Sequence, residues 1–225
     1  MGYDEKFIED MRKRQLGLDD TFNFNCLTEC RGQCCHRDDL ILTAFDIYRI
    51  AKYKEQTMSQ VITDNCFAYM GSDSKLPIIS VKPRIGDKSC RFLRMGRCEV
   101  HECKPISCKL FPLGRYLPAT AVNADYVYFL QPINCGGKDK QVVRDWIGDD
   151  MPENDIACKA WGKVIVELAQ FLQGIKNDRQ LQGFQQIILY ALYFNYDPAL
   201  DNFIEQLEYN VDKLQTVLPG FKRGK

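Results

Sequence analysis

The sequence predicts an α+β protein in which a small cysteine-rich domain of short strands and helices precedes an α-helical extension. Most of its eleven cysteines lie before residue 136, among short extended runs bounded by glycine and proline. Beyond residue 150, apolar residues recur at helical spacing in three stretches. The acidic, proline-bearing residues 148–155 separate the two patterns. We therefore expect a cysteine-cluster domain at residues 1–150 and a three-helix extension at 151–225.

The overall composition argues against several classes of protein. Thirty basic and thirty acidic side chains cancel, so no global charge draws the chain to nucleic acid or to an anionic membrane. The amino terminus lacks an apolar signal core, and the longest apolar run, residues 187–194, is too short to cross a bilayer. We expect a cytoplasmic protein in a reducing compartment, where disulfides are rare. A disulfide framework is the alternative, and it fits poorly with an odd cysteine count.

Three short helices are predicted in the first half of the chain. Residues 3–15 alternate charged and apolar side chains in a helical pattern. Thr43 is a candidate N-cap with Asp46 three residues later, before apolar residues at helical spacing. Thr57 and Gln60 form a second candidate capping box, which opens a helix expected to run to about residue 70.

Short strands are predicted around the second group of cysteines. Residues 77–85 form a strand interrupted by Pro83. Residues 90–93 and 98–101 form a hairpin about the turn Arg94-Met95-Gly96-Arg97. Residues 124–130, rich in Tyr, Val and Phe, form another strand, and a helix covers 141–147.

The carboxy-terminal extension is predicted from three apolar helix faces that would pack against one another and against the cysteine domain. The first face consists of Trp161, Val164, Ile165, Leu168 and Leu172. The second consists of Leu181, Phe184, Ile187, Ile188 and Ala191. The third consists of Leu200, Phe203, Ile204, Leu207, Val211 and Leu214.

The density of cysteine in two short segments is typical of metal ligation, because thiolate is the ligand that zinc and iron–sulfur clusters prefer. Adjacent cysteines point to opposite faces of an extended strand. Cys34 and Cys35 are therefore more readily ligands of two different metals, or one a ligand and the other a core residue, than two ligands of one ion. We predict a four-iron cluster, with zinc as the alternative and with one or two centres both open. The eight predicted ligands are Cys26, Cys30, Cys34, Cys35, Cys90, Cys98, Cys108 and Cys135.

Neighbouring residues fit an anionic centre. Gly32, and Gly136 with Gly137 after Cys135, would allow the backbone to approach a cluster closely. Residues 81–115 contain nine basic and three acidic side chains, and this surplus of positive charge would lower thiol pKa values. Two other interpretations of the positive charge are open. It could form a surface for an acidic protein partner or nucleic acid, or it could be solvated charge without a partner.

Five further residues are histidines beside the cysteines or cysteines outside the predicted ligand set. His36 and His101 lie beside the cysteines and are candidate ligands or neighbours of the site. Cys103 is either an added ligand or a bystander. Cys66 and Cys158 lie in helical patterns, and we expect both to be buried bystanders.

Over roughly residues 20–165, the cysteines and their flanking residues follow a specific order. The strings are Cys26, Cys30, Cys34 and Cys35, then Leu42-Thr43, Cys90-Arg91-Phe92-Leu93, Cys98-Glu99-Val100-His101-Glu102 and Cys108-Lys109-Leu110-Phe111-Pro112. This order resembles the YkgJ family of cysteine-cluster proteins, described as zinc- or iron-chelating domains. The opening here departs from many relatives in having three residues, not two, between its first cysteines.

The resemblance implies a metal-chelating domain, and one branch, the flagellin lysine methylase FliB, carries a similar cysteine region that is thought to bind an iron–sulfur cluster. Three functions therefore stay open. The first is an iron–sulfur protein of electron transfer or redox sensing, with a redox or regulatory protein partner. The second is a structural zinc module that binds a partner, and the third is a protein lysine methyltransferase. No nucleotide loop or hydrolase elbow supports an enzyme, and no catalytic residue is predicted.

Overall fold

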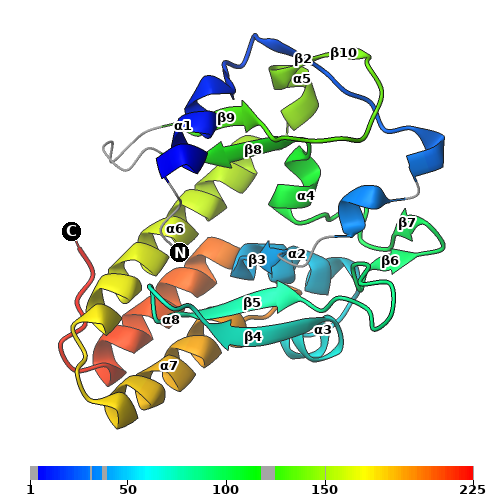
Figure 1. Cartoon of the computed structure of the whole chain (residues 1–225). Coiled ribbons are helices and arrows are strands. Elements are labelled where there is room, and N and C mark those ends of the chain that lie inside the picture. Colours follow the sequence, from blue (N-terminus) through cyan, green and yellow to red (C-terminus); the bar gives the residue numbers. More distant parts are fainter. Residues whose placement is uncertain (1–4, 31, 37–39, 118–124, 150, 225) are drawn as a thin grey trace. The chain divides into compact units, whose positions relative to one another are not determined.

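The structure is a computed structural model that describes residues 5–30, 32–36, 40–117, 125–149 and 151–224. Helices and small antiparallel sheets confirm the predicted α+β class (Figure 1). The helices are α1 (Glu5–Lys13), α2 (Ala44–Tyr53), α3 (Met58–Asn65), α4 (Ile106–Leu110), α5 (Val143–Ile147), α6 (Met151–Gln173), α7 (Asp178–Tyr193) and α8 (Phe203–Val217). The strands are β1 (Gln15–Leu16), β2 (Thr21–Asn23), β3 (Ile41–Leu42), β4 (Cys66–Met70), β5 (Pro77–Val81), β6 (Leu93–Arg94), β7 (Arg97–Cys98), β8 (Leu113–Tyr116), β9 (Val127–Leu130) and β10 (Lys140–Val142).

The chain divides into two compact units, each built from separate segments. The helical unit contains residues 35–105 and 153–225, and the smaller unit contains residues 2–34 and 106–152. One change of unit, after Pro152, falls within the acidic stretch that was predicted to separate two domains. Asp150, the last residue of the predicted first domain, lies outside the described residues, and the division at 150 stays a prediction.

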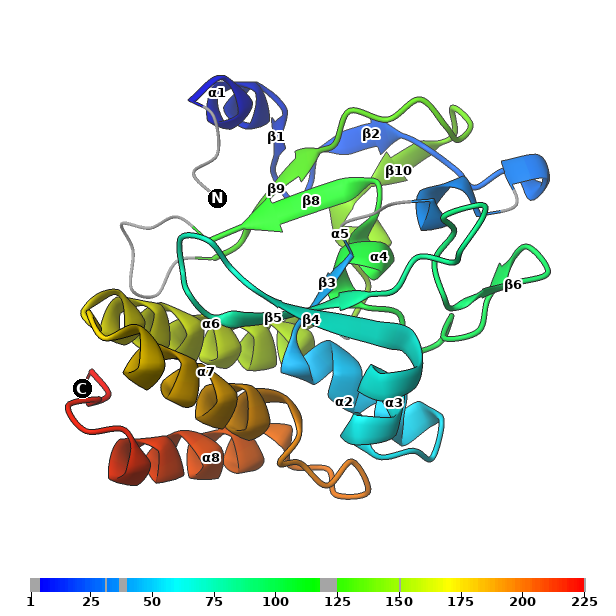
Figure 2. The same cartoon turned by 60° about the horizontal axis from the view of Figure 1, so that its bottom comes forward.

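A three-stranded antiparallel sheet in the order β3-β5-β4 forms the centre of the helical unit, and α7 packs on β5 beside α8 (Figure 2). Both predicted capping boxes are confirmed at the helices next to this sheet. The Thr43 hydroxyl accepts from the backbone N–H of Asp46 at 3.1 Å, and it starts α2. The Thr57 hydroxyl accepts from the N–H of Gln60 at 3.1 Å, and it starts α3. Each cap satisfies a backbone donor that the first helical turn leaves without a partner.

The second capped helix, α3, is shorter than predicted. It ends at Asn65, and the prediction of a helix to residue 70 is wrong because residues Cys66–Met70 form β4. This strand pairs with β5 along its whole length, and its Phe67 and Tyr69 rings stack at 5.8 Å. Aromatic side chains favour a pleated, half-buried surface, and the ladder to β5 outweighs the helical spacing of the sequence.

The three predicted carboxy-terminal helices are confirmed as α6, α7 and α8. Ile187 and Leu200 depart from the predicted faces, since they are 39% and 49% exposed and Leu200 precedes α8. No helix in the described ranges is long and apolar enough to span a bilayer. The predicted face residues that are buried are Trp161, Val164, Leu168, Leu172, Phe184, Ile188, Ala191, Phe203, Leu207, Val211 and Leu214.

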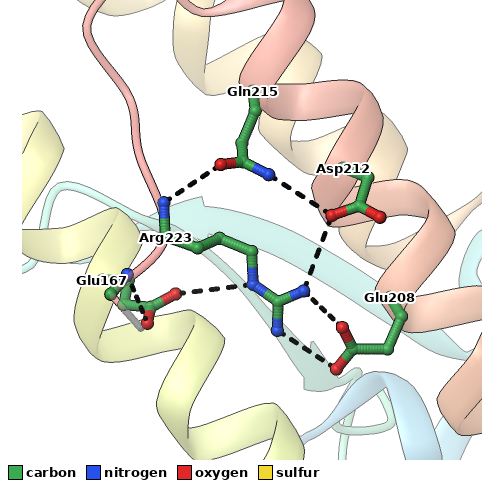
Figure 3. Close-up of polar contacts among 6 residues, drawn as sticks. Glu167, Glu208, Asp212, Gln215 and Arg223 are labelled. Carbon is green, nitrogen blue, oxygen red and sulfur yellow. Dashed lines mark hydrogen bonds and ion pairs between the residues drawn. The ribbon is translucent and has the colours of Figure 1, made fainter.

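The carboxy-terminal end of the chain is fastened to α6 and α8. Phe221 is buried, and its ring lies 5.5 Å from that of Phe171. The Arg223 guanidinium binds both carboxylate oxygens of Glu208 and lies 3.9 Å from Glu167 (Figure 3). The hydrogen bonds from Arg223 hold the pKa of Glu208 below its ordinary value. Charge and apolar burial therefore both attach this segment to the helices.

The smaller unit contains two small sheets, ordered β1-β9-β8 and β10-β2. Its centre is aromatic. The Trp146 ring meets the rings of Phe22 and Phe24 edge-on at 5.6 Å and 5.5 Å, and Phe24 meets Phe111 at 5.8 Å. Edge-to-face aromatic pairs of this kind add stability beyond their buried area.

Two predicted elements of the smaller unit differ in extent from the structure. The strand predicted at 124–130 is β9, which begins at Val127, and Ala124 lies outside the described residues. The helix predicted at 141–147 is α5, which begins only at Val143. Gln141 belongs instead to β10, where it lies opposite Phe22 of β2. Gln141 and Val142 pair with β2, although the spacing of apolar residues in the sequence had predicted a helix there.

Candidate metal centre

The first cysteine segment consists of two single turns of 3-10 helix in an otherwise irregular loop. Residues Thr28–Cys30 and Gln33–Cys35 form the turns, and Gly32 between them has a φ of +80°, which favours glycine. Cys26 and Cys34 are exposed, whereas Cys30 and Cys35 are half-buried. The thiols are therefore presented from turns, and no regular helix face aligns them.

Backbone pairing brings Cys135 to the beginning of this segment. After the β2–β10 ladder, the Phe24 N–H donates to the Asp139 carbonyl at 2.8 Å. The Gly137 N–H then donates to the Asn25 carbonyl, also at 2.8 Å. Asn25 is bonded to Cys26, and Gly137 follows Cys135 by two residues. Two thiols far apart in sequence thus project from hydrogen-bonded neighbouring backbones.

Two glycines make this close pairing possible. Gly136 has a φ of +89°, and a Cβ placed on it would lie 2.3 Å from the Phe24 ring. A Cβ on Gly137 would lie 1.8 Å from the Asn25 side-chain oxygen. The sequence predicted that these glycines admit a cluster, and the close approach that the structure displays is to Phe24 and Asn25. Approach to a cluster stays a prediction.

Four thiols of the smaller unit lie within electrostatic reach of one another. Burial raises the pKa of Cys135, and the neighbouring thiols of Cys30, Cys34 and Cys26 raise it further. The charge of a neighbouring thiolate disfavours ionisation of Cys135, as expected where like charges share a small volume. A metal ion would reverse that repulsion, because a cation stabilises coordinated thiolates.

The helical unit contributes Cys35, Cys90 and Cys98. The Cys90 N–H donates to the Cys35 carbonyl at 2.6 Å, so these two residues lie next to each other. Cys98 lies in β7. Cys103 is buried, and burial raises its pKa to about 11 while Arg49 lowers it and the Cys98 thiol adds to the increase. Cys98 and Cys103 therefore lie near each other as well.

Cys108, the remaining predicted ligand, is half-buried in α4 of the smaller unit. The indole N–H of Trp146 donates to the Leu110 carbonyl of the same helix at 3.1 Å, which fastens α4 to the aromatic centre. His36 and His101, the candidate nitrogen ligands, are both exposed.

The two cysteines predicted to be buried bystanders differ. Cys66 is buried, and burial raises its pKa to about 12. A thiol with so high a pKa is protonated at neutral pH and is a poor metal ligand. Cys158 lies half-buried on α6, so the prediction of burial is wrong for it.

Among the residues that the structure describes, no three Cys, His, Asp or Glu side chains form a group that could already hold a metal ion. The structure brings Cys26, Cys30, Cys34 and Cys135 into electrostatic reach but not into a finished coordination sphere. Sequence reasoning missed Asn25, whose carbonyl and side chain hold the Cys135 segment. The alternation in TFNFN before Cys26 is the signal of an edge strand that could have indicated it.

Residues 25–129 match a family model named CxxCxxCC, whose description is "Putative zinc- or iron-chelating domain". Over these residues the chain is similar to the CxxCxxCC family. The match includes seven of the eight predicted ligands, and Cys135 lies beyond its end. No curated protein and no solved structure matches the chain.

The residues of the CxxCxxCC segment and Cys135 fit a thiolate-bound metal. Four sulfur donors in one unit supply the number of ligands that a tetrahedral zinc ion or a four-iron cluster requires. Cys26 and Cys34 are exposed, which leaves a route for metal to enter. The donor set supports metal binding, and it fits zinc and iron equally.

Proposed function

We propose that the protein binds a four-iron cluster for electron transfer or redox sensing, with Cys26, Cys30, Cys34 and Cys135 as one ligand set. The backbone pairing of Gly137 with Asn25 carries this proposal, since it joins the distant thiol to the three in the first segment. When bound, such a cluster accepts and releases one electron at a potential that its surroundings adjust.

The chain's own residues would position and shield this centre. The left-handed backbone at Gly136 lets the Cys135 loop approach the Phe24 ring closely, and that ring packs edge-on against Trp146. Apolar surroundings limit water access and so influence a cluster's potential. A reducing compartment such as the cytoplasm would suit the centre, because thiols persist there.

Cys35, Cys90 and Cys98 of the helical unit are proposed as ligands of a second centre, and Cys108 of the smaller unit stays a candidate ligand. Cys34 and Cys35 are adjacent but belong to different compact units, and Cys35 is held by the N–H of Cys90. Two centres predict that Cys34→Ser and Cys35→Ser each lose part of the bound metal. Complete loss of metal in both variants would instead indicate one shared centre.

The decisive experiment is elemental analysis of protein purified without oxygen, together with its visible spectrum. We expect iron, acid-labile sulfide and a brown colour, and Cys135→Ser should lose much of each. Cys158→Ser is the matched control, since it removes a thiol that is not a predicted ligand. A colourless protein with stoichiometric zinc would refute the iron–sulfur proposal.

Structural zinc is the second candidate, and the family description, which names zinc as well as iron, favours it. A zinc centre would stabilise the fold outright, because zinc that binds the folded chain more tightly than the unfolded chain adds its binding free energy to that of folding. Chelation should then lower the unfolding temperature, and added zinc alone should restore it. If the protein keeps its stability after complete metal removal, the structural role is excluded.

A further inference from the structure

One hairpin of the helical unit exposes apolar side chains among basic ones. The predicted turn at Met95-Gly96 joins β6 and β7, but the strands differ from the predicted 90–93 and 98–101, since β6 is Leu93–Arg94 and β7 is Arg97–Cys98. The hairpin lies at the end of the unit away from α7 and α8 (Figures 1 and 2). Met95 at its tip is 98% exposed, and Ile85 in the preceding turn is fully exposed. We name this surface, residues 84–99, the basic hairpin. Few other aliphatic side chains described in the unit are as exposed as these two. Their exposure indicates a surface that binds a partner.

The local sequence of the basic hairpin sacrifices stability. Arg94 and Arg97 occupy directly opposed positions in the two strands, where like charges repel. Met95 has a φ of +47° and Lys88 a φ of +54°, in the left-handed region that other residues than glycine and asparagine seldom adopt. Residues that lower the stability of the fold are expected where a surface serves a function.

The charge of the basic hairpin is only partly neutralised within the chain. Arg94 donates to Glu99 at 3.0 Å, and the Asp87 carboxylate accepts from Ser89. In the described part of the chain, the guanidinium groups of Arg91 and Arg97 make no ion pair or hydrogen bond, and both residues are exposed. Their charge is available to a partner.

We propose that the basic hairpin is the docking surface for an acidic electron-carrier protein, with Met95 and Ile85 as apolar contacts inside a rim of arginines. Arg91 is bonded to Cys90 and Arg97 to Cys98, two of the proposed ligands, so the docked carrier would lie beside the metal-binding segment. The class of partner rests on the proposed function, whereas the surface does not. Methionine and arginine are both enriched in protein interfaces.

A protein partner fits this surface better than nucleic acid or membrane. The chain has no net charge, so a local basic patch steers a complementary acidic patch without a global field. The one aromatic residue of the hairpin, Phe92, is 1% exposed, so no ring is available to stack on a base. Two aliphatic contacts are also too few for stable insertion into a bilayer.

The test measures binding of the anaerobically purified full chain to two probes, an acidic plant-type ferredoxin and an acidic flavodoxin, by titration calorimetry at low and high salt. We expect micromolar binding that weakens with salt. Arg91→Ala/Arg97→Ala should weaken it about tenfold, with Lys176→Ala/Arg179→Ala as the charge-matched control on exposed residues. Met95→Asn should also weaken binding, because it removes the apolar contact while asparagine tolerates the positive φ.

Several results would overturn the proposal. These are no saturable binding to either carrier, equal binding by the hairpin variants and wild type, or tighter binding of a DNA duplex or phosphatidylglycerol vesicles with the same variant sensitivity. Circular dichroism and metal content, unchanged in the variants, show that the loss is not misfolding. A colourless zinc protein would refute the iron–sulfur proposal alone, because the titration still reports whether the hairpin binds an acidic protein.

Discussion

Replacing Gly136 with alanine tests the geometry on which the proposed metal centre depends. The residue has a φ of +89°, and its added Cβ would lie 2.3 Å from Cε2 and 2.6 Å from Cδ2 of the Phe24 ring. Phe24 cannot easily turn away, since it is 2% exposed and packs edge-on against Phe111 and Trp146. Either the ring or the Cys135 loop must therefore move.

The size of the effect follows from two contributions to the free energy of unfolding. A non-glycine residue in the left-handed region costs about 1–2 kcal/mol. Forcing an extra carbon into a packed core costs about 1–3 kcal/mol. Together, Gly136→Ala should lower the free energy of unfolding by about 2–5 kcal/mol, a large part of the roughly 5–15 kcal/mol that stabilises a typical domain.

The assay is urea unfolding of the reduced, chelator-treated protein, followed by tryptophan fluorescence in a Trp161→Phe background. Trp146 is then the single remaining tryptophan, and it contacts Phe24 directly. The matched control is Gly183→Ala on α7, where a Cβ meets nothing within 4 Å. That change should stabilise the protein by about 0.5–1 kcal/mol, because alanine is the better helix former.

Opposite signs for the two glycine variants would support the packing argument. If Gly136→Ala unfolds within about 0.5 kcal/mol of wild type, the size of change typical of neutral surface substitutions, the close approach to Phe24 is not real. The reasoning that places Cys135 beside the first cysteine segment would then lose its structural basis.

Three further outcomes are expected. Arg223→Gln should lower stability at neutral pH by about 0.5–1 kcal/mol, a small value because Glu208 is partly exposed. The pKa of Glu208 is lower in the folded than in the unfolded state. The stability difference between wild type and Arg223→Gln should therefore be complete above the ordinary glutamate pKa and vanish as pH falls through the folded-state pKa of Glu208. Urea titrations that give the same difference at every pH would contradict this account. Thr43→Ala should cost about 1 kcal/mol by loss of the α2 cap, and thermal unfolding unchanged from wild type would refute that role. In the chelator-treated protein at about pH 8, Cys66 should resist alkylation while exposed Cys34 reacts, because burial raises the pKa of Cys66 to about 12. Equal labelling of the two at early time points, measured by mass spectrometry, would exclude the burial of Cys66.

Elements specified by nearby residues were predictable from the sequence. The capping boxes at Thr43 and Thr57 each need only a hydroxyl and a partner three residues away, and both form as predicted. The β6–β7 hairpin likewise depends on the local turn at Met95 and Gly96. Such elements have their determinants within one or two turns of chain, so single-sequence reasoning reaches them.

Elements specified by distant partners were not predictable. β4 replaces the second half of a predicted helix because β5, about ten residues further on, offers it a ladder. β10 replaces the first part of another predicted helix because β2, more than a hundred residues earlier, pairs with it. Helical spacing in the sequence carries no information about either partner, so tertiary pairing decided both.

In the candidate site too, some features depend on nearby residues and others on distant ones. The sequence motif indicates which residues are ligands, whereas distant residues determine where the ligands lie. Cysteine spacing indicates thiolate chemistry, but it cannot position Cys135, which lies outside the CxxCxxCC match. Its position depends on a carbonyl of Asn25, a left-handed Gly136 and an aromatic wall at Phe24 and Trp146. A loop of exposed and half-buried cysteines buries too little apolar surface to hold itself in place, so the support must come from residues outside the motif. A related chain with the same cysteines but a bulky residue at the position of Gly136 should therefore bind metal less tightly.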